Sequence, residues 1–253
     1  MSDDDRETRR SRARETADPR APRAAPDAPS PLPARVRRIE RPPSDRGADG
    51  EVDRLYREAR GQVERGEIRE AARLYREVVM RRPDDLAARN NLGWVYDALG
   101  EPKRALHEYR QALEVDPDHV QVRTNAGACL ATLGRFEEAE EALRRARRMD
   151  PDSPGPHLNL GLVHVRRGLY RKAVECLDEA IDRDAEIGDA HLYRGVALNR
   201  LGAVDEARSA LERAVRLSPS DPRVYFNLGM VLDQKGQSER ASAMYRRARE
   251  LSG

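Results

Sequence analysis

The chain has 253 residues, of which 36% are charged and only 4% aromatic, and its formal net charge is +2. This composition excludes a large aromatic-rich core, and no run approaches the roughly eighteen apolar residues of a membrane span. Residues 51–253 carry equal numbers of basic and acidic side chains, whereas a nucleic-acid-binding surface needs an excess of Lys and Arg. We therefore expect neither a membrane nor a nucleic acid as partner.

The first fifty residues differ in composition from the rest of the chain. They contain eight prolines, twelve arginines and ten acidic residues, with almost no apolar periodicity. Such a segment cannot bury enough apolar surface to offset the entropy lost on ordering. Residues 1–50 are therefore predicted to form a disordered Arg/Pro/Asp-rich arm that precedes a folded domain at 51–253.

The N-terminal sequence and the cysteines bear on location. MSDDDRETRRSRARE lacks the apolar stretch of a secretory signal. Cys129 and Cys176 lie far apart in helical sequence, which favours buried thiols over a disulfide. Together these features predict a cytoplasmic protein.

From residue 52 onwards the sequence repeats at one fixed interval, which falls within the range typical of stacked-repeat proteins. Glycine recurs at 66, 100, 134, 168, 202 and 236, and alanine at 71, 105, 139, 173, 207 and 241. A second small-residue column begins with Ala59 and continues with glycine at 93, 127, 161, 195 and 229. Six units follow one another, starting near residues 52, 86, 120, 154, 188 and 222.

Each unit is predicted to contain two helices, as the second unit illustrates. Leu92, Val95, Tyr96 and Leu99 recur at helical spacing, and Gly100 then supplies a turn because glycine adopts positive φ at low cost. A second apolar stripe over residues 105–113 follows, and proline at 117 ends it. In later units a Ser or Asp before proline, at 153–154 and 221–222, is typical of a helix start.

The small residues inside the helices predict a close helix crossing. A glycine in mid-helix costs about 1 kcal/mol relative to alanine, yet five of the six units contain one. A Cβ atom at these positions would collide with a second helix, and the alanine column is the expected opposite side of the contact. The sequence thus predicts an antiparallel helix pair, repeated six times.

The pattern of Leu92-Gly93, Tyr96, Gly100, Ala105, Tyr109, Ala112 and Pro117 resembles the tetratricopeptide repeat (TPR). The resemblance extends from residue 52 to the last residue, 253, and so covers most of the chain. It implies an all-α, right-handed superhelical solenoid of six antiparallel helix pairs, with a concave groove lined by the first helices. The departures are mild: Ala59 replaces glycine in the first unit, Ala185 replaces proline in the fourth, and no solvating helix follows the sixth.

The resemblance places ligands in the groove, where two kinds of side chain recur. One column holds Asn91, Asn125, Asn159 and Asn227, with Tyr193 in the remaining place. These amides could hydrogen-bond the backbone of a peptide, or alternatively could bond a neighbouring helix. The neighbouring columns are expected to add apolar and basic contacts, mostly in units four to six, from Trp94, Leu158, Leu162, Arg166, Leu192, Val196, Arg200, Arg223, Phe226 and Met230.

Other candidate sites receive structural interpretations. Some relatives capture chaperone tails with a clamp of Lys, Asn, Asn, Lys and Arg, and no three successive units here reproduce it. The run Arg144–Arg148 follows a run of glutamates, so i,i+4 pairs Glu140–Arg144 and Glu141–Arg145 are expected on a solvated helix. His157 and His164 are seven residues apart, which is not a metal-ligand spacing, and are interpreted as packing residues. We expect no catalytic, metal or cofactor site.

The function predicted from the sequence is a protein–protein interaction scaffold or adaptor that binds a partner peptide or helix in the concave groove. The alternative is a regulatory subunit whose groove is occupied by its own arm. Residues 32–44, with Leu32, Val36 and Ile39, would then dock until modification near Ser44 releases them, and partners would use the convex face or the C-terminal end. A homodimer through the last helix is also considered, because the apolar residues of that helix lack a following repeat and are expected to stay partly uncovered: Met244, Tyr245, Ala248 and Leu251.

Overall fold

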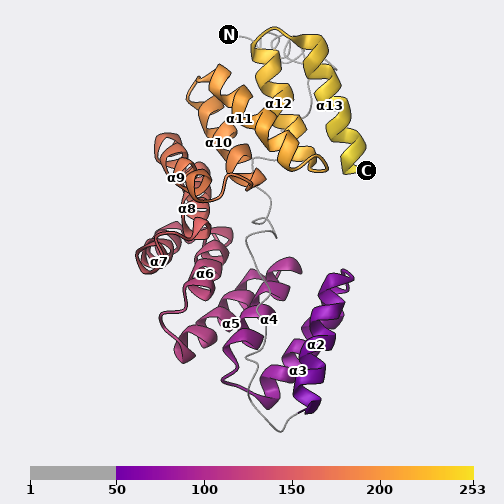
Figure 1. Ribbon diagram of the computed structural model, residues 1–253, viewed down its shortest axis with the longest axis vertical. Helices are drawn as coiled ribbons and strands as arrows, with labels where there is room; N and C mark the ends of the chain where they lie inside the picture. The colour runs from indigo at the N-terminus through magenta and orange to yellow at the C-terminus, as the bar shows by residue number, and fades with distance from the viewer. Residues whose placement is uncertain (1–49) are drawn as a thin grey trace, which may run out of the picture. The chain divides into compact units, whose positions relative to one another are not determined.

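The computed structural model describes residues 50–253, and all regular elements in that range are α-helices. They follow one another in chain order from the indigo end of the domain to the yellow end (Figure 1). Their bounds are α2 (Gly50–Glu64), α3 (Ile68–Arg81), α4 (Leu86–Ala98), α5 (Pro102–Val115), α6 (Val120–Thr132), α7 (Phe136–Met149), α8 (Pro154–Arg166), α9 (Tyr170–Arg183), α10 (Gly188–Arg200), α11 (Val204–Leu217), α12 (Pro222–Gln234) and α13 (Ser238–Ser252).

The even-numbered helices are the first helices of six repeats, and the odd-numbered helices are the second. Within every repeat the two helices pack against each other, and each second helix also packs against the first helix of the next repeat. This arrangement confirms the predicted solenoid of six helix pairs. The arm predicted for residues 1–50 and the proposed docking of residues 32–44 lie outside the described range, apart from Gly50, and stay predictions.

The first helices form the inner layer of the solenoid. From α4 to α12 each first helix contacts the first helix of the next repeat, whereas successive second helices make no comparable contact in residues 50–253. The inner layer is therefore closer packed than the outer layer. Within residues 50–253 no helix has the length and apolar composition needed to cross a membrane.

Glycine ends the first helix of every repeat in the same way. Gly100 has φ of 75°, in the left-handed region that a Cβ atom disfavours. Its N–H donates to the Asp97 carbonyl oxygen, and the Glu101 N–H donates to the Tyr96 carbonyl oxygen at 2.9 Å. This hydrogen-bond pattern satisfies the last carbonyls of the helix and turns the chain toward α5.

The mid-helix glycines allow close helix crossings. A Cβ atom at Gly161 would lie 2.6 Å from Cγ of Leu177, and one at Gly93 would lie 2.5 Å from the Tyr109 ring. The nearest side chains therefore belong to a bulky column on the second helix. The alanine column also faces the glycines, because the backbone oxygens of Ala139 and Ala207 would lie 3.4 Å and 3.2 Å from Cβ atoms at Gly127 and Gly195. The alanines of this column, such as Ala173, are buried.

The two predicted helix starts behave differently. The Asp221 carboxylate accepts a hydrogen bond from the Arg223 backbone N–H at 2.9 Å, as an N-cap should. Ser153 occupies the N-cap position of α8 without a side-chain hydrogen bond. Pro156, the third residue of α8, has no N–H to donate, which removes one of the two groups that a serine cap would satisfy.

Candidate partner-binding face

The predicted amide column lies on the inner layer, and its members have partners within the repeat domain. Asn91 donates to the Tyr56 hydroxyl at 2.5 Å, and Asn125 donates to the Asn90 side-chain oxygen at 3.0 Å. Asn159 and Asn227 each donate to the carbonyl four residues earlier in their own helix. The contacts of Asn91 and Asn125 are those of the alternative in which the amides bond a neighbouring helix, whereas Asn159 and Asn227 bond their own helices. Asn91, Asn125 and Asn159 are buried, and only Asn227 is half-buried.

The larger apolar side chains of the predicted site divide into buried and half-buried groups. Leu158, Leu162, Leu192 and Tyr193 are buried in the core between repeats. Trp94, Val196 and Met230, which occupy one repeat column, are half-buried, as is Phe226 beside them on α12. Phe226 packs against Tyr245 of α13 with ring centroids 5.6 Å apart. The half-buried group is the part of the predicted apolar site that keeps accessible surface.

The positive charge of Arg223 is already paired with acidic residues of the domain. Its guanidinium pairs with Asp221 at 2.6 Å and with Asp189 at 2.9 Å, and it donates to the Tyr193 hydroxyl at 3.2 Å. Burial opposes the charge, but the hydrogen bonds to Asp221 and the nearby Asp189 raise the Arg223 pKa overall. This network ties α12 to α10.

The other two arginines of the predicted face differ in exposure. Arg166 is half-buried and donates to the Ala131 carbonyl oxygen of α6 at 2.9 Å, and burial lowers its pKa. Arg200, at the end of α10, is exposed to solvent. The structure thus leaves Arg200 as the basic side chain of this face with the most accessible surface.

The remaining sequence predictions receive mixed outcomes. Arg144 pairs with Glu140 as expected, but Arg145 reaches Asp118 of the preceding repeat at 3.0 Å instead of Glu141. His157 and His164 are both buried. Cys129 and Cys176 are free thiols. In residues 50–253, no three His, Cys, Asp or Glu side chains lie together as metal ligands would.

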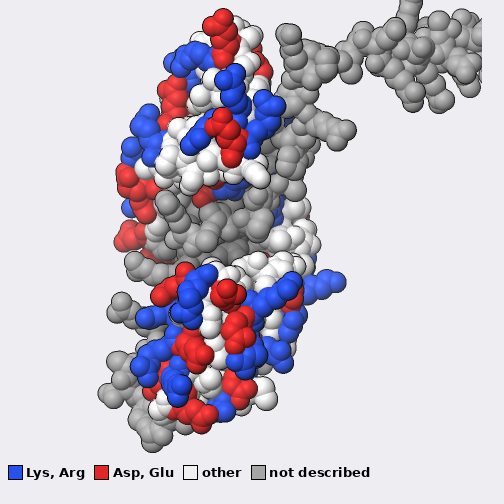
Figure 2. Space-filling view, turned by 90° about the vertical axis from the view of Figure 1, so that its right-hand side faces the viewer, with Lys and Arg blue, Asp and Glu red and all other residues white. Residues whose placement is uncertain are grey.

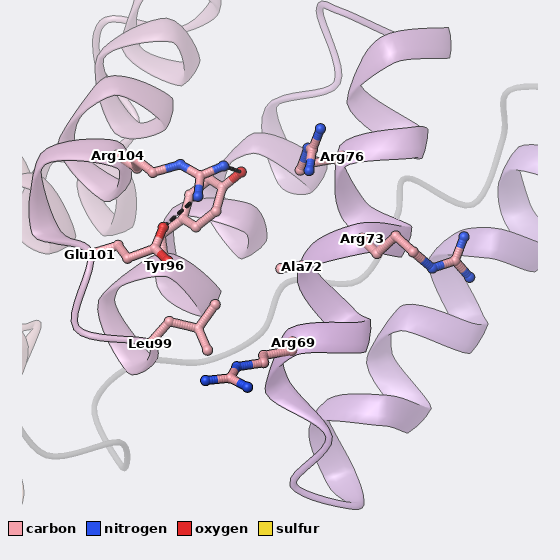
Figure 3. A pocket seen from close by; sticks show the side chains of 8 residues that line it. All are labelled: Arg69, Ala72, Arg73, Arg76, Tyr96, Leu99, Glu101 and Arg104. Carbon is pink, nitrogen blue, oxygen red and sulfur yellow. Dashed lines mark hydrogen bonds and ion pairs between the residues drawn. The ribbon is translucent and has the colours of Figure 1, made fainter.

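A second candidate site, which the sequence analysis missed, lies between α3 and the α4–α5 pair. It is a pocket of about 230 Å³ (Figure 3), lined by Arg69, Ala72, Arg73, Arg76, Tyr96, Leu99, Glu101 and Arg104. Four of these eight residues are arginines and one is acidic. Repeat columns alone do not single out this site, because Lys103 and Arg171 share the column of Arg69, and Arg110 and Arg144 share that of Arg76. On the face seen in Figure 2, basic and acidic side chains are interspersed.

Aromatic and ionic contacts hold one arginine of the pocket in place. The Arg104 guanidinium lies 4.1 Å from the centroid of the Tyr96 ring and donates to the Tyr96 hydroxyl at 2.8 Å. It also pairs with Glu101 at 2.5 Å. Burial raises the pKa of Tyr96, and the charges of Arg104 and Arg76 act in the opposite direction. Tyr96 therefore remains a neutral phenol at physiological pH.

Comparisons with known proteins identify the repeat. Residues 34–253 match the family model described as "Cilia and flagella-associated protein 70 C-terminal domain", a TPR domain. No curated protein matches the sequence.

Solved structures show the same fold at low sequence identity. A tetratricopeptide repeat protein from Parabacteroides merdae aligns with a TM-score of 0.68 at 19% identity, covering 80% of this chain and 79% of that one. PilF of Pseudomonas aeruginosa gives 0.65 at 23% identity, covering 78% and 89%. YrrB, "a TPR protein with an unusual peptide-binding site", gives 0.51 at 22% identity, covering 70% and 91%. With the family match over residues 34–253, the chain belongs to the tetratricopeptide repeat family of the cilia and flagella-associated protein 70 C-terminal domain.

Proposed function

We propose that this protein is a scaffold that holds a segment of a partner protein against the inner layer, with the strongest contacts in the fifth and sixth repeats. The main supporting observation concerns one repeat column. Its members Trp94, Val196 and Met230 are half-buried and keep apolar surface accessible, whereas Ala128 and Leu162 are buried. Accessible apolar side chains on neighbouring repeats, here Val196 and Met230, are typical of protein-interaction surfaces. TPR membership supports a binding role without chemistry.

The chemistry of this face describes the partner segment. Val196, Phe226 and Met230 favour apolar side chains, and exposed Arg200 favours an acidic residue beside them. The Asn227 amide, half-buried on the same helix as Met230, can offer hydrogen bonds to an extended backbone. An acidic–apolar segment in extended or helical form is therefore the proposed ligand. The cytoplasmic location predicted from the sequence is part of this proposal, and the two free thiols support it.

Photo-crosslinking from single positions tests the proposal. A benzophenone amino acid would replace Met230 or Trp94 on the inner layer, with Met80 of α3, which is 72% exposed, as the outer-layer control. We expect the same partner peptide to be crosslinked from Met230 and Trp94 and not from Met80. Crosslinks formed only from Met80 would contradict the proposal and favour the convex-face alternative. Repeating the experiment with residues 1–49 deleted tests whether the arm competes with the partner for the inner layer. If it does, the deletion should increase the yield of crosslinked partner.

Self-association through α13 stays a prediction. Met244, Tyr245 and Leu251 are half-buried there, so each retains surface that a second copy could cover, whereas Ala248, expected to be uncovered, is buried. Light scattering that shows a monomer at high protein concentration would contradict it.

A further inference from the structure

The pocket between α3 and α4–α5 is one of five equivalent places in the solenoid. We call each place where a second helix meets the two helices of the next repeat a junction, numbered along the chain. The pocket is the first junction, α7 with α8 and α9 is the third, and α11 with α12 and α13 is the fifth. Because the repeat length is constant, each pocket residue has a counterpart at the other junctions.

The third and fifth junctions neutralise their own charges. At the third, Glu140 of α7 pairs with Arg167 at 2.8 Å, and Glu137 pairs with the same guanidinium at 3.3 Å. At the fifth, Asp205 pairs with Lys235. In both, an acid on the second helix meets a cation from the turn of the next repeat.

The first junction reverses this arrangement. Arg69 stands in the column of Glu137 and Asp205, Ala72 in the column of Glu140, and Leu99 in the column of Arg167 and Lys235. Relative to the third junction, the two acids are thus replaced by a base and a small apolar residue. The second and fourth junctions likewise carry a base in the Arg69 column, at Lys103 and Arg171. The cation that would meet them is replaced by an apolar side chain.

Two guanidiniums of the pocket have no acidic partner among the described residues. The carboxylates nearby are already engaged, because Glu101 pairs with Arg104 and Glu70 pairs with Arg73. Figure 3 shows Arg69 extending toward Leu99 and Arg104 lying over Tyr96, whereas Arg73 points away from both. No ion pair links Arg69 or Arg76 to an acidic side chain of residues 50–253, although both are exposed at the rim of the pocket.

We propose that the first junction binds the phosphate group of a phosphorylated side chain in a partner peptide. A phosphate carries close to two negative charges at pH 7 and three acceptor oxygens, which matches two uncompensated guanidiniums better than a single carboxylate does. Arg104, held over the Tyr96 ring, is preorganised to add a third donor. Ala72 and Leu99 provide an apolar floor for the carbon stem of the phosphorylated residue. This site does not depend on the apolar column of the inner layer.

Nuclear magnetic resonance of the arginine side chains provides the test. The full chain would be titrated at low salt with the peptide acetyl-Ala-Ala-phosphoSer-Leu-Ala-amide, and with matched peptides that carry Ser or Glu at the central position. We expect saturable shifts of the Arg69 and Arg76 Nε–H signals with the phosphoserine peptide, and at least about tenfold weaker binding of the other two.

Two double variants separate this pocket from general electrostatic attraction. Arg69→Gln with Arg76→Gln should weaken phosphopeptide binding at least about tenfold. The control is Arg110→Gln with Arg171→Gln, which removes the same charge from exposed positions of the same two columns in other repeats and should change affinity less than about twofold. Circular dichroism checks that both variants fold. Equal losses in the two variants, equally tight binding of the Glu peptide, or no saturable shift at all would overturn the proposal.

Discussion

The first and third junctions show how one backbone arrangement can carry opposite chemistry. At the third junction Glu140 is buried and is shared by Arg144, Arg167 and His164, so the interface is filled by its own charges. At the first junction Ala72 takes the place of the acid, and a pocket remains open beside it. The repeat thus fixes where two units meet. A few side chains at that junction determine whether its charges pair with each other or line an open pocket.

The two junctions are also expected to contribute differently to the stability of the fold and to ligand binding. A nearly buried ion pair stabilises its junction only while all partners are present. If one partner is removed, the remaining charge is still desolvated but no longer paired, which is unfavourable. Exposed arginines such as Arg69 contribute little to folding, since exposed charges are screened by water. We therefore expect substitutions at the third junction to affect mainly stability, and substitutions at the first to affect mainly binding.

The largest effect should come from the helix crossing that both junctions share. Gly161→Leu places a side chain where even a Cβ atom would lie 2.6 Å from Leu177, so the free energy of unfolding should fall by about 1–3 kcal/mol. Urea denaturation followed by circular dichroism measures this. The control is Gly61→Ala, where a Cβ atom meets only the flexible Arg65 side chain at 3.4 Å and stability should stay equal or rise. An unchanged free energy of unfolding for Gly161→Leu would contradict the claim that the helix pairs of the junctions cross closely at this glycine.

A smaller loss is expected from neutralising the third junction. Glu140→Gln keeps the shape of the side chain but removes the charge that Arg144 and Arg167 share. Because both arginines retain access to water, the cost should be about 1–2 kcal/mol, below that of breaking a fully buried pair. Glu141→Gln, an exposed position on the same helix, should change stability by less than about 0.5 kcal/mol. Equal effects in both variants would show that the third junction is not held by its ion pairs.

The smallest effect concerns pH at the same junction. Burial lowers the pKa of His164 below 6.5, and Lys172, Arg144 and Arg167 add to this effect while Glu140 opposes it. The unfolded chain therefore binds the proton more readily, so His164 destabilises the fold as the pH falls below about 6.5. His164→Leu, which installs the residue of the same column at 130, 198 and 232, should relieve this loss.

Denaturation at pH 7.5 and pH 5 checks the prediction for His164. The gain in unfolding free energy of His164→Leu over the wild type should be larger at pH 5, by under about 1 kcal/mol. An advantage that is the same at both pH values would mean that protonation of this histidine does not act on stability.

The repeat architecture could be predicted from the sequence because its determinants are local and recur. A glycine such as Gly100 is required by its positive φ, and mid-helix Gly161 by the close crossing, so both appear at one fixed interval. Six repetitions of weak signals amount to a strong prediction of helix pairs.

Charge partners could not be predicted in the same way because they depend on neighbours in adjacent repeats. Arg145 could pair with Glu141 on its own helix, yet in the structure it pairs with Asp118, which precedes α6. An equivalent contact recurs between Glu186 and Arg213. Arg223 likewise reaches back to Asp189, a contact between repeats that already pairs the charge expected on the partner face.

The central claim is that the choice of side chains at a junction decides between internal neutralisation and phosphate binding. Converting the first junction into the third tests it most directly, with Ala72→Glu combined with Leu99→Arg, which leaves the net charge of the protein unchanged. The measurement is the affinity for the phosphoserine peptide. We predict at least about a tenfold loss of affinity, with the free energy of unfolding altered by less than about 1 kcal/mol. Unchanged affinity in a folded double variant would contradict the account.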